Sequence, residues 1–277
     1  VEQLAHGLGQ QGTHDAQSDK KALSREDHSF LQFLRGDGII RRTLDGISVP
    51  EDDVAGLGGL DDGERLQVIA GGAQAVAAAL GAEPDRVFFT SGGTEADNWA
   101  ILSAAERLGK RGRHIITTAA EHHAVLHPMQ KLEAKGFEVT YLQPDHDGTI
   151  TVEELKKALR PDTILVSVMM VNNETGAVMP IADMIRATRR MSPLALFHTD
   201  AVQGFLKVPF SARTLGADLI SVSSHKIHGP KGAGALYISP RTSAKSGHII
   251  NYRYPFLSLH ISSKPLLYVS LHHSRSF

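Results

Sequence analysis

Short apolar runs alternate with longer amphipathic stretches between residues 86 and 238. This alternation is typical of parallel strands joined by crossover helices, so it predicts an α/β core. The runs at 164–171 and 219–222 are almost entirely apolar, as in strands that are covered on both faces. We expect seven strands, at residues 87–90, 114–117, 137–142, 163–171, 194–199, 218–223 and 233–238.

One helix start is marked with particular clarity. Thr151 and Glu154 have the spacing of a capping box, which predicts a helix that begins there. Leu155 and Leu159 are its expected apolar positions, and Pro161 is its expected end.

The two ends of the chain lack this pattern. Residues 1–64 show no clear periodicity and begin with Val rather than Met, which indicates a piece of a longer protein. Residues 242–277 contain no acidic residue and are rich in Ser and His. Because an abrupt change of composition marks a boundary, we expect an organised domain over 65–241 between these segments. The tail is either an edge hairpin or a segment of different genetic origin.

Composition narrows the class of protein. The 277 residues, 42% hydrophobic and 21% charged, fit a soluble globular protein of one large or two modest domains. A net charge of −1 argues against general affinity for nucleic acid or a membrane surface and favours a small-molecule partner. With no signal peptide and no run near the roughly 20 apolar residues of a membrane span, we expect a cytoplasmic protein, or a mitochondrial one in a eukaryote. The absence of cysteine excludes disulfides, thiolate metal sites and cysteine nucleophiles.

Lys226 stands between an apolar strand and the Gly/Pro-rich turn at 229–232. A lysine in a semi-apolar cleft near positive groups loses part of its ammonium stabilisation, so its amine can condense with an aldehyde. Pyridoxal 5′-phosphate (PLP) is anchored in this way. From this run alone, a surface lysine in a turn is an equal alternative.

Gly92, Gly93 and Thr94 lie between the strand at 87–90 and a helical stretch at 96–108. Glycines let backbone amides approach a phosphate closely, and the helix N-terminus adds a partial positive charge. The Thr94 hydroxyl can donate one more hydrogen bond. A Gly-Gly turn is weak evidence by itself, and it gains weight beside Lys226.

Asp200 and Gln203 follow the strand at 194–199, at the edge where ligands of open α/β sheets gather. The Asp200 carboxylate could pair with a protonated pyridine nitrogen, and Gln203 could reach the phenolic oxygen of the ring. The alternative for Asp200 is a helix N-cap. Asn173 follows the strand at 163–171 and either orients the substrate or ring oxygen or only belongs to a turn.

His122 follows the strand at 114–117, where an imidazole could stack on the pyridine ring and shuttle protons. His123 and His127 are four residues apart and are candidate metal ligands. Because no acidic third ligand shares their face and Pro128 disturbs the helix, we expect no metal site.

Five ordered motifs, TSGGTEADN, EHHAVLHPM, VNNETGAV, HTDAVQ and SSHKIHGPKGAGALYI, resemble the cysteine desulfurase branch of the class V aminotransferases, of the NifS/IscS type. The resemblance covers residues 73–241. It implies the type I PLP fold: a large domain with a mostly parallel seven-stranded sheet, a small domain built from both chain ends and incomplete here, and a homodimer.

The resemblance also implies a role for each candidate residue. Lys226 would carry PLP, Asp200 would pair with the pyridine nitrogen, and His122 would stack on the ring and act in catalysis. Gln203 would contact the ring oxygen, and Asn173 would face the substrate. The phosphate would be bound by Gly93, Thr94, Ser223 and His225.

Three parts of the family pattern are not recognisable. They are an N-terminal substrate-site motif before residue 65, an arginine segment soon after residue 241, and the cysteine that carries sulfur. The intact family converts L-cysteine to L-alanine and passes the sulfur to an acceptor for iron–sulfur cluster or thio-cofactor synthesis. For this chain we expect PLP chemistry on L-cysteine or a similar amino acid, without sulfur transfer. A selenocysteine lyase or other class V PLP enzyme, a non-catalytic relative that dimerises with a complete desulfurase, and a truncated gene product are the alternatives.

Overall fold

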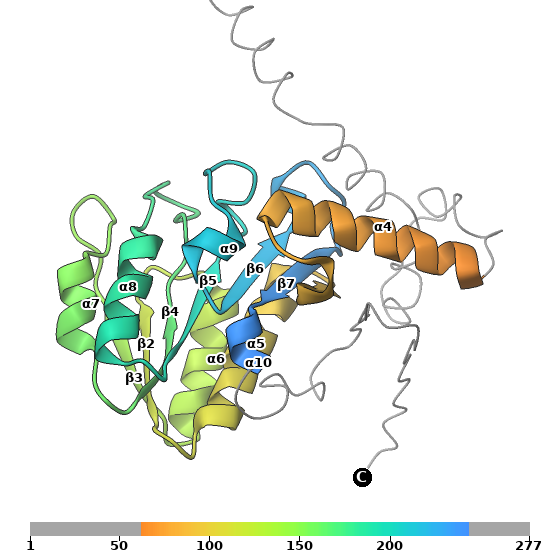
Figure 1. The fold of residues 1–277 in the computed structure, drawn as a ribbon. Helices are drawn as coiled ribbons and strands as arrows, with labels where there is room; N and C mark the ends of the chain where they lie inside the picture. Colours follow the sequence, from red (N-terminus) through yellow and green to blue (C-terminus); the bar gives the residue numbers. More distant parts are fainter. Residues whose placement is uncertain (1–61, 244–277) are drawn as a thin grey trace, which may run out of the picture.

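The computed structural model describes residues 62–243 (Figure 1). The expected segments 1–64 and 242–277 therefore lie almost entirely outside the described residues, and the boundaries proposed for them stay predictions.

A single seven-stranded sheet forms the centre of the fold, in the order β1-β7-β6-β5-β4-β2-β3. Neighbouring strands from β3 to β6 are parallel, and β7 is antiparallel to both β6 and β1. All seven predicted strands are present. They are β1 (Val87–Thr90), β2 (His114–Thr118), β3 (Glu138–Leu142), β4 (Thr163–Ser167), β5 (Leu196–Asp200), β6 (Leu219–Ser223) and β7 (Gly234–Ile238).

Strand β4 is shorter than its apolar run predicts. It ends at Ser167, although the chain stays tied to the neighbouring strand through Met170 N–H, which donates to Asp200 O at 2.8 Å. Further on, Val171 pairs with Val178 in an isolated bridge. The apolar character of 168–171 therefore reflects burial beyond the strand end, which hydrophobic patterning alone does not distinguish from strand.

Helices cover both faces of the sheet (Figure 1). The buried residues form two clusters, one against α5 and α6 and the other against α4, α7, α8 and α9. The bounds are α4 (Asp62–Leu80), α5 (Gly93–Leu108), α6 (His123–Ala134), α7 (Val152–Ala158), α8 (Ile181–Met191), α9 (Ala212–Leu215) and α10 (Pro240–Ser243), with 3-10 turns η3 (Pro84–Arg86) and η4 (Ser224–Lys226). This two-sided cover explains why β2, β4, β5, β6 and β7 are buried along their whole length.

The N-cap bond of the predicted capping box is present. The Thr151 hydroxyl accepts a hydrogen bond from Glu154 N–H at 3.2 Å, which satisfies one free donor at the start of α7. The helix ends at Ala158, three residues before Pro161.

A buried carboxylate, Asp218, fastens the chain just before β6. Its side chain is fully buried and accepts from Arg189 at 2.6 Å, from Arg241 at 2.8 Å and from Phe197 N–H at 2.6 Å. These bonds join α8, β5 and α10 at one point. The negative charge is therefore balanced by two guanidinium groups in the folded protein.

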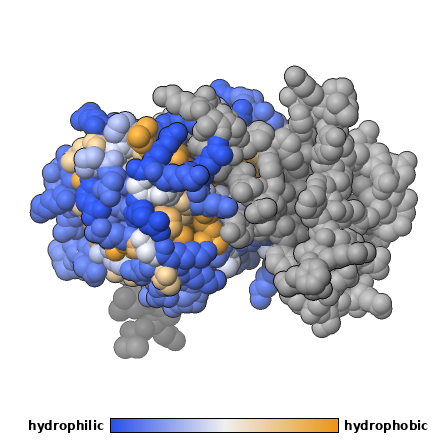
Figure 2. Space-filling model, turned by 90° about the horizontal axis from the view of Figure 1, so that it is seen from below, coloured by the Kyte–Doolittle hydropathy of each residue, from blue (hydrophilic) through white to orange (hydrophobic). Residues whose placement is uncertain are grey.

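The described surface is mainly hydrophilic on the face shown in Figure 2, with a patch of apolar side chains near its centre. Within residues 62–243, no helix has the length and apolar character needed to cross a membrane.

Candidate active site at the carboxyl ends of the strands

A cavity of about 420 Å³ opens where β5 and β6 end and where the loops after β1, β2 and β4 meet. Open α/β sheets bind their ligands at this edge. All nine residues that were predicted to contact PLP or the substrate line this cavity: Gly93, Thr94, His122, Asn173, Asp200, Gln203, Ser223, His225 and Lys226.

The loop between β1 and α5 forms one wall of the cavity. Gly92 has a φ of 153°, which side-chain-bearing residues rarely adopt. Strand β7 also approaches this loop so closely that a Cβ at Gly234 would lie 2.7 Å from Gly92 Cα. Glycine at both positions therefore lets α5 begin at the cavity, where its first N–H groups have no partner within the helix. Such a wall suits a phosphate.

Lys226 reaches the cavity from the η4 turn that follows β6. Ser224 holds this turn: its hydroxyl donates to Ala233 O at 3.0 Å, and its carbonyl accepts from Ile227 N–H and Gly229 N–H at 3.0 and 2.9 Å. The turn is thus fixed to the start of β7. A lysine on such a rigid turn has a defined position, which a residue that binds an aldehyde needs.

His225 lies among positive groups. Its Nδ1 is 2.8 Å from the Ser223 hydroxyl. Burial lowers the pKa of His225, and the nearby Lys226, His122 and Lys231 lower it further. A wall that gathers this much positive charge beside a helix N-terminus favours an anionic ligand group.

Asp200 ends β5 and is 7% exposed. Its Oδ1 accepts from Val202 N–H at 2.8 Å, as an N-cap side chain would, but residues 202–207 form a turn and not a helix. Burial raises the pKa of Asp200 to about 7, and the charge of Asp97 adds to this effect, while Val202 N–H, His198 and His122 oppose it. The carboxylate is therefore held where its negative charge lacks a balancing cation from the described residues.

His122 is exposed and caps α6, because its Nδ1 accepts from Ala124 N–H at 3.1 Å. The preceding Glu121 is buried and accepts from Thr118 Oγ1 at 3.0 Å and Met169 N–H at 2.8 Å. Burial raises the pKa of Glu121 well above its usual range. Glu121 thereby fixes the backbone from which His122 projects.

Asn173 is exposed at the cavity, and its neighbour Asn172 explains the turn. Asn172 Oδ1 accepts from the N–H groups of Glu174 and Thr175 at 2.9 and 2.8 Å, and Nδ2 donates to Ala120 O at 2.9 Å. The buried asparagine shapes the loop, and the exposed one faces the cavity. Gln203 lies within reach of Lys207, whose Nζ donates to Gln203 Oε1 at 3.3 Å.

Sequence reasoning missed the polar residues beneath the cavity. Asp97 lines the cavity from α5 and is 1% exposed, and His198 of β5 is fully buried beside it. One signal was available: Asp97 is a carboxylate on a helix face that is otherwise apolar, with Ala96, Trp99 and Ala100 around it.

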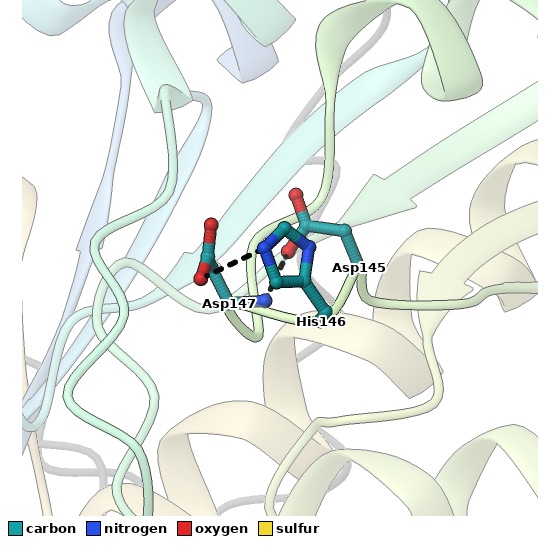
Figure 3. Close-up of side chains that lie close together, drawn as sticks. All are labelled: Asp145, His146 and Asp147. Atoms are coloured by element: carbon teal, nitrogen blue, oxygen red, sulfur yellow. Dashed lines mark hydrogen bonds and ion pairs between the residues drawn. The ribbon is translucent and has the colours of Figure 1, made fainter.

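His123 and His127 contact each other with ring centroids 5.3 Å apart, and both are exposed. Within residues 62–243, three potential metal ligands meet only at Asp145, His146 and Asp147, on the exposed loop after β3 (Figure 3). Asp145 Oδ1 already accepts from Asp147 N–H at 3.0 Å and from Thr149 N–H at 2.8 Å, which accounts for this arrangement as a turn.

Comparison with known proteins identifies the family of the chain. The model of the family "Aminotransferase class-V" matches residues 63–250. The cysteine desulfurase IscS of Dictyoglomus turgidum is 50% identical over 167 residues, which are 60% of this chain and 42% of that protein. Among solved structures, a NifS-like protein aligns with a TM-score of 0.64 and 38% identity over 79% of this chain and 57% of its own. The structure of SspA in complex with cysteine aligns with a TM-score of 0.62 and 35% identity, over 76% of this chain and 61% of its own.

The chain therefore belongs to the aminotransferase class-V family, with the type I fold of PLP-dependent enzymes. Within this family it is a member of the cysteine desulfurase group of NifS/IscS-like proteins, and PLP is the cofactor of that group. The chain spans about two fifths of the length of the curated relative quoted above.

Proposed function

We propose that this chain is the PLP-binding part of a cysteine desulfurase-like protein and that Lys226 is the residue that carries the cofactor. One observation supports this most strongly: Lys226, Asp200 and the loop that begins α5 line the same cavity. They come from three separate segments of the sequence, and each suits a different group of PLP.

The donor set fits PLP at both of its charged groups. The N-terminus of α5, Thr94 and Ser223 offer hydrogen-bond donors beside the positive charge of Lys226 and Lys231, which suits a phosphate. Asp200 offers a buried carboxylate that suits a protonated pyridine nitrogen. When bound, PLP supplies an aldehyde that condenses with amines and a ring that accepts electrons from a substrate carbanion.

The remaining candidates complete the proposed assignment. Asp200 pairs with the pyridine nitrogen, and Gln203 donates to the ring oxygen. His122 stacks on the ring, a place that its exposed imidazole at the cavity wall can reach. Asn173 faces the substrate. The phosphate is bound by Gly93, Thr94, Ser223 and His225.

The residues around Lys226 also suit proton transfer from an amino acid substrate. An amine on a fixed turn can take a proton from the substrate α-carbon, and the exposed His122 can pass protons to water. We propose L-cysteine or a similar amino acid as the substrate. The chain of 277 residues has no cysteine, so none of its own side chains can receive sulfur as a persulfide. We therefore propose PLP chemistry without sulfur transfer to this chain.

Absorbance spectroscopy of the full chain with PLP tests this assignment. We expect a visible absorbance band from an adduct between PLP and the protein. Reduction with borohydride should make this attachment permanent, so that mass spectrometry recovers the reduced cofactor on the peptide that contains Lys226. Lys226→Ala should lose the band. Lys157→Ala, which removes an exposed lysine from α7, should keep it.

Folded protein without the band would contradict the proposal and favour the non-catalytic or truncated relative. A band that L-cysteine changes, without release of sulfide, would support the proposed loss of sulfur transfer. Selenocysteine in place of cysteine tests the lyase alternative in the same assay.

We further propose a cytoplasmic homodimer that meets a sulfur-acceptor or scaffold protein, as the resemblance to desulfurases implies. Light scattering on the purified chain tests the dimer. A monomer at all concentrations, with PLP bound, would contradict it.

A further inference from the structure

Asp97 is a buried carboxylate without a cationic partner. It lies on the face of α5 that packs against the sheet, it is 1% exposed, and it lines the same cavity as Asp200. Its Oδ1 has no hydrogen-bond partner and lies 3.4 Å from Nε2 of His198. An unsatisfied buried carboxylate is costly, so this one calls for an explanation.

His198 cannot balance that charge. Its Nδ1 is 2.8 Å from Ser167 Oγ and its Nε2 is 3.0 Å from Ser221 Oγ, so hydroxyl groups from β4 and β6 hold the ring on both sides. Burial lowers the pKa of His198 to about 4, although the charge of Asp200 opposes this. The imidazole is therefore neutral near pH 7 and acts as a hydrogen-bonding spacer.

Strand geometry brings His198, and with it Asp97, beneath Asp200. His198 and Asp200 are two residues apart on β5, so both side chains point to the same face of the sheet. That face is the one α5 covers, because Leu196, two residues before His198, belongs to the cluster packed on α5. Asp97, His198 and Asp200 thus occupy one buried layer between α5 and β5.

The carboxyl groups of Asp97 and Asp200 both lack a cationic partner among the described residues. Within residues 62–243, Asp200 forms no ion pair, and the His198 ring is the one basic group that lies against Asp97. Other charges that act on this pair are carboxylates: each of the two raises the pKa of the buried Glu121, and Asp97 raises that of Asp200. Burial raises the pKa of Asp97 to about 7, against a hydrogen bond from Ser221, and it raises that of Asp200 to about 7 as well. Both groups would be stabilised as anions by a single cation placed at the cavity floor.

We propose that Asp97 is a positioning residue which, held against His198, places a second negative charge behind Asp200 and so strengthens the preference of the cavity for a protonated pyridine nitrogen. This inference rests on the proposed binding of PLP. Asp97 acts through the charge that Asp200 and the ring nitrogen experience, without bonding to the ring.

The test compares the full chain with Asp97→Asn, which keeps the shape and removes the charge. The matched control is Glu106→Gln, which removes an exposed carboxylate from the same helix. Three quantities are measured for each protein: PLP affinity, the melting temperature without PLP, and the ¹⁵N chemical shift of PLP labelled at its ring nitrogen.

For Asp97→Asn we expect PLP affinity to fall about tenfold, equivalent to one pKa unit at the ring nitrogen. The ¹⁵N shift should move towards that of unprotonated pyridine, and the melting temperature without PLP should stay level or rise, because an unpaired buried charge is removed. Glu106→Gln should match the wild type in all three. Asp97→Ser, smaller and also neutral, should reproduce the ¹⁵N change if the asparagine does not fold.

Two results would overturn this inference and leave the proposed function intact. One is a variant that binds PLP as tightly as the wild type with the same ¹⁵N shift. The other is a lower melting temperature with weaker binding but an unchanged ¹⁵N shift, which indicates a purely structural role. Wild-type protein that folds but forms no adduct at Lys226 would instead overturn the proposed function, and this inference with it.

Discussion

Buried carboxylates occur at two places in this sheet, and their surroundings are opposite. Asp218, just before β6, accepts from two arginines and one backbone N–H. Asp97 and Asp200, at the carboxyl ends of the strands, are nearly as well buried and have no such cations among residues 62–243, and the charge of the buried Glu121 is also nearby. The charge of Asp218 is balanced by arginines of the protein itself. The charges of Asp97 and Asp200 would be balanced only by a cation that binds from outside the protein.

The difference separates a structural role from a binding role. Removing one member of a balanced buried group leaves unpaired charge, so Asp218 contributes to folding. An unbalanced carboxylate disfavours the folded state until a cation arrives, so Asp97 and Asp200 contribute to ligand binding. Substitution of Asp218 should therefore lower stability more than PLP affinity. Substitution of Asp97 or Asp200 should lower PLP affinity more than stability.

The largest effect on stability is expected for Asp218→Asn. It leaves Arg189 and Arg241 without their shared partner, at a cost of about 3 kcal/mol in unfolding free energy. Urea unfolding measures this cost. Asp183→Asn, which removes an exposed carboxylate paired with Arg186, should cost about 0.5 kcal/mol or less. Equal losses in the two variants would contradict the structural role of Asp218.

Asp200→Asn should instead weaken PLP binding while folding stays intact. The amide still accepts from Val202 N–H but loses the charge-assisted bond to the ring nitrogen, about 2.5 kcal/mol or close to a hundredfold in affinity. Titration with PLP, followed by absorbance, measures the loss. An unchanged affinity would remove Asp200 from the site.

The unbalanced charge of Asp200 should also make the stability of the protein depend on pH. A carboxyl group whose pKa rises from 3.8 unfolded to about 7 folded binds more protons in the folded state, so its contribution to stability falls as the pH rises through this window. Without PLP, the advantage of Asp200→Asn over the wild type should grow from about pH 4 to about pH 7, by roughly 3 kcal/mol.

Above that window the advantage should stay constant. Unfolding titrations at a series of pH values measure the difference, in which the opposite contributions of buried histidines cancel. If the difference in unfolding free energy between Asp200→Asn and the wild type does not vary with pH, the charge of Asp200 is balanced in the folded protein and the prediction is wrong.

The smallest effect is expected for Ser167→Ala, which removes one hydroxyl from the His198 ring. The lost hydrogen bond should cost about 1 kcal/mol in unfolding free energy. PLP affinity should change by less than about threefold, because no charge is altered. A larger loss of affinity would mean that His198 itself sets the charge at the site.

The strands and the cavity residues were predictable because their signals are local. Apolar runs mark β2, β4, β5 and β6, and the glycine-rich turn and Lys226 follow strands directly. The direction of β7 follows from its short connection to β6, because a parallel strand needs a longer crossover. The predictions of an α/β class, a seven-stranded sheet and a desulfurase-like family were confirmed.

The buried polar layer was not predictable in the same way. Asp97, His198 and Ser221 come from three elements that meet only in the folded protein. Asp97 and His198 stand inside the motifs TSGGTEADN and HTDAVQ, but nothing in either motif indicates that the two residues lie side by side. Glu121 reads in the sequence as a loop residue, yet it is buried because Thr118 and Met169 donate to it from β2 and from the segment after β4. Such burial depends on packing between distant segments, which local patterning does not record.

The most direct test is the rise in melting temperature that PLP causes in the full chain, measured for the wild type, Asp200→Asn and Asp218→Asn. We predict that Asp218→Asn melts at a lower temperature but keeps the PLP-dependent rise, whereas Asp200→Asn without PLP melts at or above the wild-type temperature and loses most of the rise. A rise of equal size in Asp200→Asn and the wild type would contradict the account of the unbalanced carboxylates.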